Sequence, residues 1–478
     1  MRLQLEGRIG SEPDALNIDI RNIGTYSQNG EHYLYTATGR NGGINVYALS
    51  QSGEFPTSRN SLYYSENLQN SLTDATELVQ IGATPNLIFA SDQDHLIGAT
   101  LTNSGGLGTV SNIDISHLQS AEISSLESFA LANGHALYIA DQATGKIQAY
   151  TVAITGEVLR ISETNTRENG SADQGQILLA SGQFSQTSLL VAAGPSTQTV
   201  TSYRINSATG ALTHQGTSGA VDGLGIDAPS ALEVLTAHDQ NWVIVAGAGS
   251  SSLSVMRLET NGALIATDHI IDSLTTRFQG VQAMSVVQVE NQVFVIAGGA
   301  DDGLSLLTLL PDGRLVHLQT LVNSIGSGLE NISTISATHV GNDIQVFATS
   351  QSHSGVTQLN IPLDQIGMVK TGREDGGTVQ YGTQRADLLV SGGEDADTLV
   401  GLDGDDILVA GHGNTAMTGG SGADLFVMWA GGYHVTITDF ENGATVWICL
   451  ISQCYATLRS YHSWRRQLAH LFPFETTA

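Results

Sequence analysis

The chain has 478 residues, of which 41% are hydrophobic, so it is long enough for more than one domain and has enough apolar side chains for a real core. Its 46 acidic residues outnumber the 18 basic ones, and the formal net charge of -28 argues against nucleic acid or an anionic membrane as a partner. Cations are the natural partners of such a chain. Only Cys449 and Cys454 are cysteines, so a disulfide framework is excluded.

The N-terminal sequence MRLQLEGRIGSEPDALNIDI has no apolar run that would serve as the core of a signal peptide. No stretch of about 18 apolar residues occurs anywhere in the chain. We therefore expect a soluble protein without a membrane span. It is either cytoplasmic or exported by a route that needs no N-terminal signal.

The first three-quarters of the chain contain an internal repeat. An apolar strand, a small polar turn, an alternating strand and a Gly-x-Leu-like turn recur seven times, at intervals of 49 to 54 residues. With a strand-like segment before and after each copy, every period contains about four short strands, which is typical of one propeller blade. The copies begin at His32, Asn86, His135, Thr187, Asn241, Asn291 and Asn342.

The segments NVYALSQSGEF, QAYTVAITGEVL and TSYRINSATGALT resemble the blade ends of lactonase-like, or YVTN-type, seven-bladed propellers. We expect such a propeller over residues 1–369, with RLQLEGRI near the N-terminus pairing as the outer strand of the last blade. Because some propellers of this family hydrolyse sugar lactones, the resemblance implies a hydrolase as one possible function. No catalytic residue can be placed, since the blade histidines form no metal-spaced pair and no G-x-S-x-G elbow is present.

After a predicted linker at 370–381, a nine-residue period begins and extends over residues 382–427. The copies are GTQRADLLV, GGEDADTLV, GLDGDDILV, AGHGNTAMT and GGSGADLFV. Their large apolar residues are Leu389, Leu399, Leu408, Met417 and Phe426, and their sixth positions are Asp387, Asp397, Asp406, Thr415 and Asp424.

This period resembles the RTX, or haemolysin-type, calcium-binding repeat, which forms a parallel β-roll. The resemblance implies calcium as the cofactor and secretion by the type I machinery. Calcium binds six to eight oxygen atoms, which the aspartates and the carbonyls of the glycine-rich turns can supply. The predicted metal-binding residues are Asp387, Gly393, Asp397, Gly404, Asp406, Gly411, Gly413, Gly420, Gly422 and Asp424.

Two nonapeptides make one coil, so the sixth positions divide between two edges of the roll. Asp387, Asp406 and Asp424 stack on one edge, whereas Asp397 stacks with Thr415 on the other, where we expect weaker calcium binding. Without calcium these carboxylates would repel one another. The sequence therefore predicts that the roll folds because calcium binds it.

Residues 428–445, which contain ITDF, are predicted to cap the roll, but the tail at 446–478 is atypical. It holds both cysteines, three arginines and a single acid, Glu475, whereas the family usually ends in an acidic, cysteine-free secretion signal. Our hypothesis is that the tail arose from a shifted reading frame or an unrelated replacement. The alternative is an amphipathic terminal helix, suggested by the spacing of Leu458, Tyr461, Trp464, Leu468 and Leu471.

Together these features predict an all-β, extracellular calcium-binding protein whose propeller presents a binding surface to an unknown ligand or protein. The alternatives are a secreted lactonase-like hydrolase, with the roll as an accessory, and a structural or adhesion component of a cell surface. A propeller channel lined by His, Arg and carboxylate side chains would favour the hydrolase. A channel lined by small and apolar groups would favour binding.

Overall fold

The computed structural model describes residues 1–39, 42–64, 76–81, 84–90, 96–113, 115, 123–153, 155, 157–166, 176–184, 187–194, 197–374, 377–393, 396–428 and 434–440, and the backbone of 446–449 and 456–458. The chain forms two compact units. One is a propeller built from Arg2–Val289 and Val293–Ile361, and the other is a roll built mainly from Pro362–Ala478.

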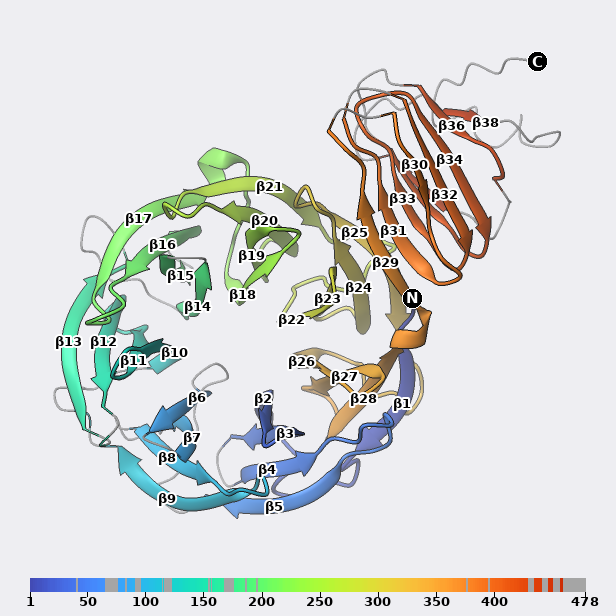
Figure 1. The fold of residues 1–478 in the computed structure, drawn as a ribbon. Coiled ribbons are helices and arrows are strands. Elements are labelled where there is room, and N and C mark those ends of the chain that lie inside the picture. The colour runs from blue at the N-terminus through green and yellow to red at the C-terminus, as the bar shows by residue number, and fades with distance from the viewer. Residues whose placement is uncertain are drawn as a thin grey trace. The chain divides into compact units, whose positions relative to one another are not determined.

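The propeller consists of seven four-stranded sheets arranged in a ring, which confirms the predicted fold class (Figure 1). In the first six blades the strands follow chain order from the inner to the outer strand. Their bounds in the first three blades are β2 Ile20–Gln28, β3 Glu31–Thr38, β4 Gly43–Ala48 and β5 Thr57–Tyr63; β6 Thr76–Ile81, β7 Thr84–Ala90, β8 Leu96–Leu101 and β9 Leu107–Ile113; β10 Ile123–Leu131, β11 Gly134–Asp141, β12 Lys146–Val152 and β13 Val158–Asn165.

The next three blades repeat the same order of strands. Their bounds are β14 Leu178–Phe184, β15 Thr187–Gly194, β16 Thr199–Ile205 and β17 Leu212–Gly219; β18 Pro229–Ala237, β19 Gln240–Gly247, β20 Ser252–Leu258 and β21 Leu264–Ile271; β22 Ala283–Val289, β23 Gln292–Gly298, β24 Gly303–Leu309 and β25 Leu315–Val322. Four strands in each repeat period were expected from the sequence, and the structure confirms them.

The seventh blade closes the ring with a strand from the other end of the propeller sequence. β26 Ile332–Val340, β27 Asp343–Ser350 and β28 Val356–Pro362 are its inner three strands, and β1 Gln4–Ile9 pairs antiparallel with β28. The predicted role of the N-terminal strand is therefore confirmed. Because this pairing joins the two ends of the propeller, the ring needs no further element to hold it closed.

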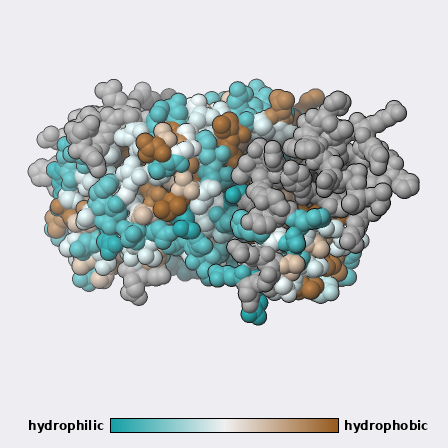
Figure 2. All heavy atoms as spheres, turned by 90° about the horizontal axis from the view of Figure 1, so that it is seen from above, coloured by the Kyte–Doolittle hydropathy of each residue, from teal (hydrophilic) through white to brown (hydrophobic). Residues whose placement is uncertain are grey.

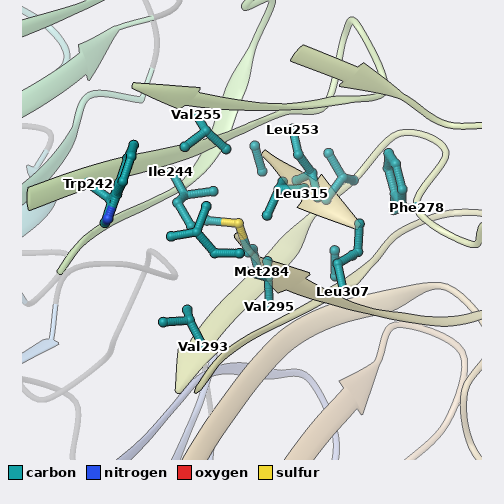
Figure 3. Close-up of a cluster of buried hydrophobic side chains, with 14 of the residues drawn as sticks. Trp242, Ile244, Leu253, Val255, Phe278, Met284, Val293, Val295, Leu307 and Leu315 are labelled. Carbon is teal, nitrogen blue, oxygen red and sulfur yellow. The ribbon is translucent and has the colours of Figure 1, made fainter. Parts of the chain in front are cut away.

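The core of the propeller lies between neighbouring blades, where apolar side chains of facing sheets meet. Figure 3 shows the cluster between the fifth and sixth blades, in which Trp242 and Ile244 from β19 pack with Val293 and Val295 from β23. All four side chains are almost completely buried. Burying a side chain of this size stabilises a fold by about 1.5–3 kcal/mol, so each blade depends on its neighbours for most of its stability.

Exposed apolar side chains are scattered over the surface. Figure 2 shows small brown patches within a mainly hydrophilic face. Within the described ranges the only helices are two 3-10 turns, η1 Ala220–Asp222 and η2 Leu363–Gln365, and no helix is long and apolar enough to cross a membrane.

The roll is built from two five-stranded parallel sheets, so each coil contributes one strand to each sheet. One sheet contains β29 Ile366–Thr371, β31 Ala386–Val390, β33 Ile407–Val409, β35 Leu425–Met428 and β37 Val446–Cys449. The other contains β30 Val379–Tyr381, β32 Asp397–Asp403, β34 Thr415–Ser421, β36 Val435–Ile437 and β38 Ala456–Leu458.

The parallel register confirms the alignment of the nonapeptides. Leu389 pairs with Leu408 and Leu408 with Phe426 in one sheet, while Leu399 pairs with Met417 in the other. All five side chains are buried between the two sheets and form the core of the roll. The large apolar residue of each nonapeptide therefore contributes to the core of the roll, as the repeat predicts.

The roll begins earlier than the nine-residue pattern does. β29 and β30 include residues assigned to the linker at 370–381, yet they pair in parallel with β31 and β32. The nonapeptide pattern does not extend to this coil, because Lys370 and Gln380 occupy its large apolar positions. The ammonium group of Lys370 and the side-chain amide of Gln380 donate to the carbonyl oxygens of Tyr381 and Val390, at 2.7 and 2.9 Å, so polar groups occupy this end of the roll.

The C-terminal segments contribute only short described strands. β36 lies between β34 and β38, and β37 and β38 are the edge strands of the two sheets, all in parallel pairing. Residues 429–433 and 441–445 of the predicted cap lie outside the described residues. So do residues 450–455 and 459–478 of the tail, and the frame-shift hypothesis and its helical alternative therefore remain predictions.

One residue of the roll has a backbone conformation that its side chain disfavours. Leu402 has a φ of 87°, in the left-handed region, and it pairs with Gly420, whose φ is 100°. Leu402 is the second residue of its nonapeptide, where the copies GGEDADTLV and GGSGADLFV have glycine. A bulky residue in this region costs about 1–2 kcal/mol.

We expect Leu402→Gly to raise the free energy of unfolding of the roll by about 1 kcal/mol relative to Leu402→Ala. Both variants remove the partly exposed leucine side chain, but only glycine removes the Cβ atom that causes the strain. Urea unfolding in the presence of calcium, monitored by circular dichroism, measures the difference. Equal stability of the two variants would show that the Leu402 backbone is not strained.

Candidate functional site

The predicted aspartates lie at the two edges of the roll, at or next to the start of its short strands. Asp387 lies in β31, Asp406 and Asp424 directly precede β33 and β35, and Asp397 begins β32. All four are at most 3% exposed, although carboxylates are seldom buried without a charged partner. The structure thus buries four carboxylates beside a small apolar core.

On one edge the aspartates form a hydrogen-bonded ladder, which we call the aspartate ladder. Asp387 donates its backbone N–H to Oδ1 of Asp406 at 2.8 Å, and Asp406 donates its own N–H to Oδ1 of Asp424 at 3.1 Å. The N–H of Met368 donates to Oδ1 of Asp387 at 2.6 Å. Each carboxylate therefore ties its own coil to the preceding coil, as the predicted stacking of these three aspartates requires.

On the other edge, the carboxylate of Asp397 accepts four hydrogen bonds. It accepts hydrogen bonds from the backbone N–H groups of Thr378 and Gly392 and from the hydroxyls of Thr378 and Ser391, at 2.6 to 2.9 Å. Burial alone would raise the pKa of Asp397, but these four donors outweigh it and lower the pKa below its ordinary value. Asp397 pairs with Thr415 in the neighbouring strand, as expected.

Asp406, in the middle of the ladder, is the exception. Its Oδ2 atom is buried and has no hydrogen-bond partner. Burial raises the pKa of Asp406 to about 8, with a further contribution from the negative charges of Asp424, Asp387 and Asp405. An unpaired oxygen on a buried carboxyl group is costly, so Oδ2 of Asp406 is a candidate ligand for a cation.

The surroundings of this oxygen suit a hard cation. A Cβ atom built on Gly401 would lie 2.1 Å from Oδ2 of Asp406 and 2.5 Å from the carbonyl oxygen of Gly419, so only glycine leaves room for these oxygens to approach each other. Carboxylate and carbonyl oxygens are the ligands that calcium prefers. Among the described residues no three His, Cys, Asp or Glu side chains converge on one point, so the remaining ligands would be turn carbonyls.

The predicted glycines lie where neighbouring turns come closest. Gly404, Gly420 and Gly422 have positive φ angles, and side chains there would collide with the backbone of the preceding coil. Gly393 and Gly411 approach the carbonyl oxygens of Glu374 and Gly392 in the same way, and the Gly413 carbonyl accepts a long hydrogen bond from Thr415. Their role in stacking is thus visible, whereas their role as metal ligands stays a prediction.

The second candidate site is a cavity of about 310 Å³ in the centre of the propeller. The inner strands of all seven blades contribute to its lining, which consists of hydroxyl, amide and aliphatic side chains together with one acid, Glu233. No histidine, arginine or lysine is found among the described residues of this lining. The described lining matches neither criterion set above, because it has a carboxylate without histidine or arginine and is not made of small and apolar groups.

Glu233 belongs to a set of glutamates at the same position of three inner strands. Glu77 in β6 accepts hydrogen bonds from the N–H and hydroxyl of Ser128 in the next blade, the latter at 2.7 Å. Glu127 in β10 accepts the same pair of bonds from Ser181, at 2.9 and 2.6 Å. Glu233 has no such partner among the described residues.

We call these three residues the channel glutamates, because they lie on the inner strands that surround the central cavity. Burial changes the acidity of all three. Burial raises the pKa of Glu77 and of Glu233 to about 7, although hydrogen bonds from Ser128 oppose the shift at Glu77. Burial also raises the pKa of Glu127 well above its ordinary value, and the charges of Glu77 and Glu233 raise it further. Our sequence reasoning missed these residues. The available signal was a glutamate next to leucine, as in TEL, LES and LEV, recurring in register with the blades.

No family model matches the sequence, and no curated protein matches it. Among solved structures, the chain is similar to a protein of Lactobacillus plantarum (16% identity, 64% of this chain and 86% of that chain covered, TM-score 0.47). It is also similar to a periplasmic gluconolactonase of Pseudomonas aeruginosa (14%, 64% and 86%, TM-score 0.46) and to a candidate 6-phosphogluconolactonase of Bacteroides fragilis (14%, 71% and 97%, TM-score 0.43). At such low identity these similarities say nothing about the substrate or activity of this chain.

Glu233 should make the propeller less stable as the pH rises. Because its pKa is higher in the folded than in the unfolded state, the folded protein holds more protons, and stability falls between about pH 4 and pH 7. Glu233→Gln cannot ionise. We therefore expect the variant to lose less stability than the wild type between pH 5 and pH 8, by up to about 3 kcal/mol.

Urea unfolding of the wild type and the variant at the two pH values measures this difference. Glu259→Gln is the control, because Glu259 lies in the same blade but is exposed and paired with Arg257. Identical pH dependence of Glu233→Gln and the wild type would contradict the assigned environment of Glu233.

Proposed function

We propose that this protein is an extracellular calcium-binding protein of the RTX type, in which calcium completes the roll at the aspartate ladder. The buried Oδ2 atom of Asp406, which has no hydrogen-bond partner, is the observation that carries this proposal. The nonapeptide register and the parallel pairing of the strands support it. Oδ2 of Asp406 and turn carbonyls such as that of Gly419 would hold the ion, with Asp387 and Asp424 on the neighbouring coils.

The ion would supply positive charge where the fold concentrates negative charge. Ionised Asp406 lies near three other carboxylates, and no basic side chain pairs with it among the described residues. Leaving such a charge buried and unpaired costs several kcal/mol. The bound ion would offset that cost, so calcium binding and the stability of the roll are linked.

The proposed location follows from the calcium affinity that we expect. Extracellular calcium modules bind with dissociation constants of about 10⁻⁴ to 10⁻³ M, which matches the concentration outside cells. The degenerate nonapeptides favour this weak range. Export by the type I secretion machinery is part of the proposal and rests on the resemblance of the repeats.

For the propeller we propose a binding role. A hydrolase needs a nucleophile or an activated water with a base and a group that stabilises negative charge. The described lining of the channel provides one glutamate and no cationic side chain. The observed site therefore fits recognition of a ligand better than acyl transfer.

Removing the charge at Asp406 should reduce the stabilisation by calcium without destabilising the calcium-free roll. Asp406→Asn keeps an oxygen that can accept the N–H of Asp387 but carries no buried charge. We expect its calcium affinity to fall by at least about tenfold, which corresponds to the loss of one charged contact. Calorimetric titration of calcium into the full chain measures the affinity, and urea unfolding in chelator measures the stability.

Asp397→Asn is the matched variant on the opposite edge. Since Asp397 already accepts four hydrogen bonds, its substitution should destabilise the calcium-free roll while lowering calcium affinity less than Asp406→Asn does. Equal losses of affinity in the two variants, or no calcium binding by the wild type up to several millimolar, would refute the proposed function.

A further inference from the structure

The channel glutamates differ in one respect that points to a ligand. The blade-to-blade pattern places a donor opposite each glutamate, on the inner strand of the next blade. Ser285 in the sixth blade takes the position of a glutamate, since its hydroxyl accepts the N–H of Ala337 as Glu127 accepts that of Ser181. The residue after Ser285, which corresponds to Ser128, is therefore Val286.

Valine has no hydroxyl group, so the sixth blade cannot give Glu233 the side-chain donor that Glu77 and Glu127 receive. Glu233 consequently has neither a hydrogen bond nor an ion pair among the described residues. It also borders the central cavity. Among the described residues, Glu233 is thus the channel glutamate that has no partner and that also lines the cavity.

The other lining groups define what this space can accept. Asn22, Gln282 and Gln351 offer amide groups, and Ser125 and Ser230 offer hydroxyls, from five different blades. An anionic ligand such as a phosphorylated or carboxylated sugar would meet Glu233 without any described cation to balance its charge. A cationic group, in contrast, would form an ion pair with the Glu233 carboxylate, which has no partner among the described residues.

We propose that the central cavity of the propeller binds a small ligand that carries one ammonium group and several hydroxyl or amide groups. The ammonium group pairs with the Glu233 carboxylate, and the polar groups of the ligand bond to the ring of amides and hydroxyls. A divalent metal ion fits less well, because no three acidic or histidine side chains converge on one point within the described residues. This site lies within the propeller and does not depend on calcium binding by the roll.

Glucose and two of its derivatives, of which gluconate is the open-chain acid, test the charge requirement. Glucosamine is cationic, glucose is neutral and gluconate is anionic. Ligand-observed NMR and calorimetric titration with the full chain, in chelator and again with calcium, should show that glucosamine binds at least about tenfold more tightly than glucose, the gain of one charged contact. Gluconate should not bind.

Glu233→Gln should reduce glucosamine binding to the level of glucose. Glu77→Gln is the matched control, since Glu77 occupies the same strand position but is paired with Ser128 and does not border the cavity. Thermal unfolding shows whether each variant is folded, and Glu233→Asp serves if the glutamine variant is not. Binding of gluconate, no preference for glucosamine, or unchanged glucosamine binding by Glu233→Gln would each overturn this assignment, whether or not the roll binds calcium.

Discussion

The hydrogen bonds of the aspartate ladder are the interaction on which the roll depends. Asp387 and Asp406 each donate an N–H to the carboxylate of the next coil, so every carboxylate that joins two coils also adds buried negative charge. The apolar core between the two sheets is small and cannot compensate for several unpaired charges. Stacking and charge repulsion therefore oppose each other in the same residues, and Asp406 is where the conflict is left unresolved.

The propeller resolves a similar conflict with different means. Glu77 and Glu127 are enclosed between blades, but each accepts two hydrogen bonds from a serine of the following blade, which also ties neighbouring inner strands together. Glu233 is buried in the same way, but no described serine of the following blade donates a hydrogen bond to it. Unsatisfied acids thus occur in both units, and in each case the neighbouring groups are oxygen-rich and lack a described basic partner. This common feature agrees with the strongly acidic composition of the chain.

Much of the fold could be predicted from the sequence because it repeats. The blade period, the closing strand near the N-terminus and the register of Leu389, Leu408 and Phe426 all follow from spacing alone. The first coil of the roll could not be predicted, since Lys370 and Gln380 pair through their backbones and keep no apolar signature. The channel glutamates were not predicted, because their role depends on a contact with the next blade, about fifty residues away in the sequence.

The most direct test of the central claim, that the aspartate ladder needs a cation, is amide hydrogen exchange of the full chain with and without calcium. The N–H groups of Asp387 and Asp406 are the rungs of the ladder and report its formation residue by residue. Our account predicts fast exchange of both in chelator and strong protection in millimolar calcium, while the amides of the propeller blades change little. Equal protection of the two amides in both conditions would contradict it.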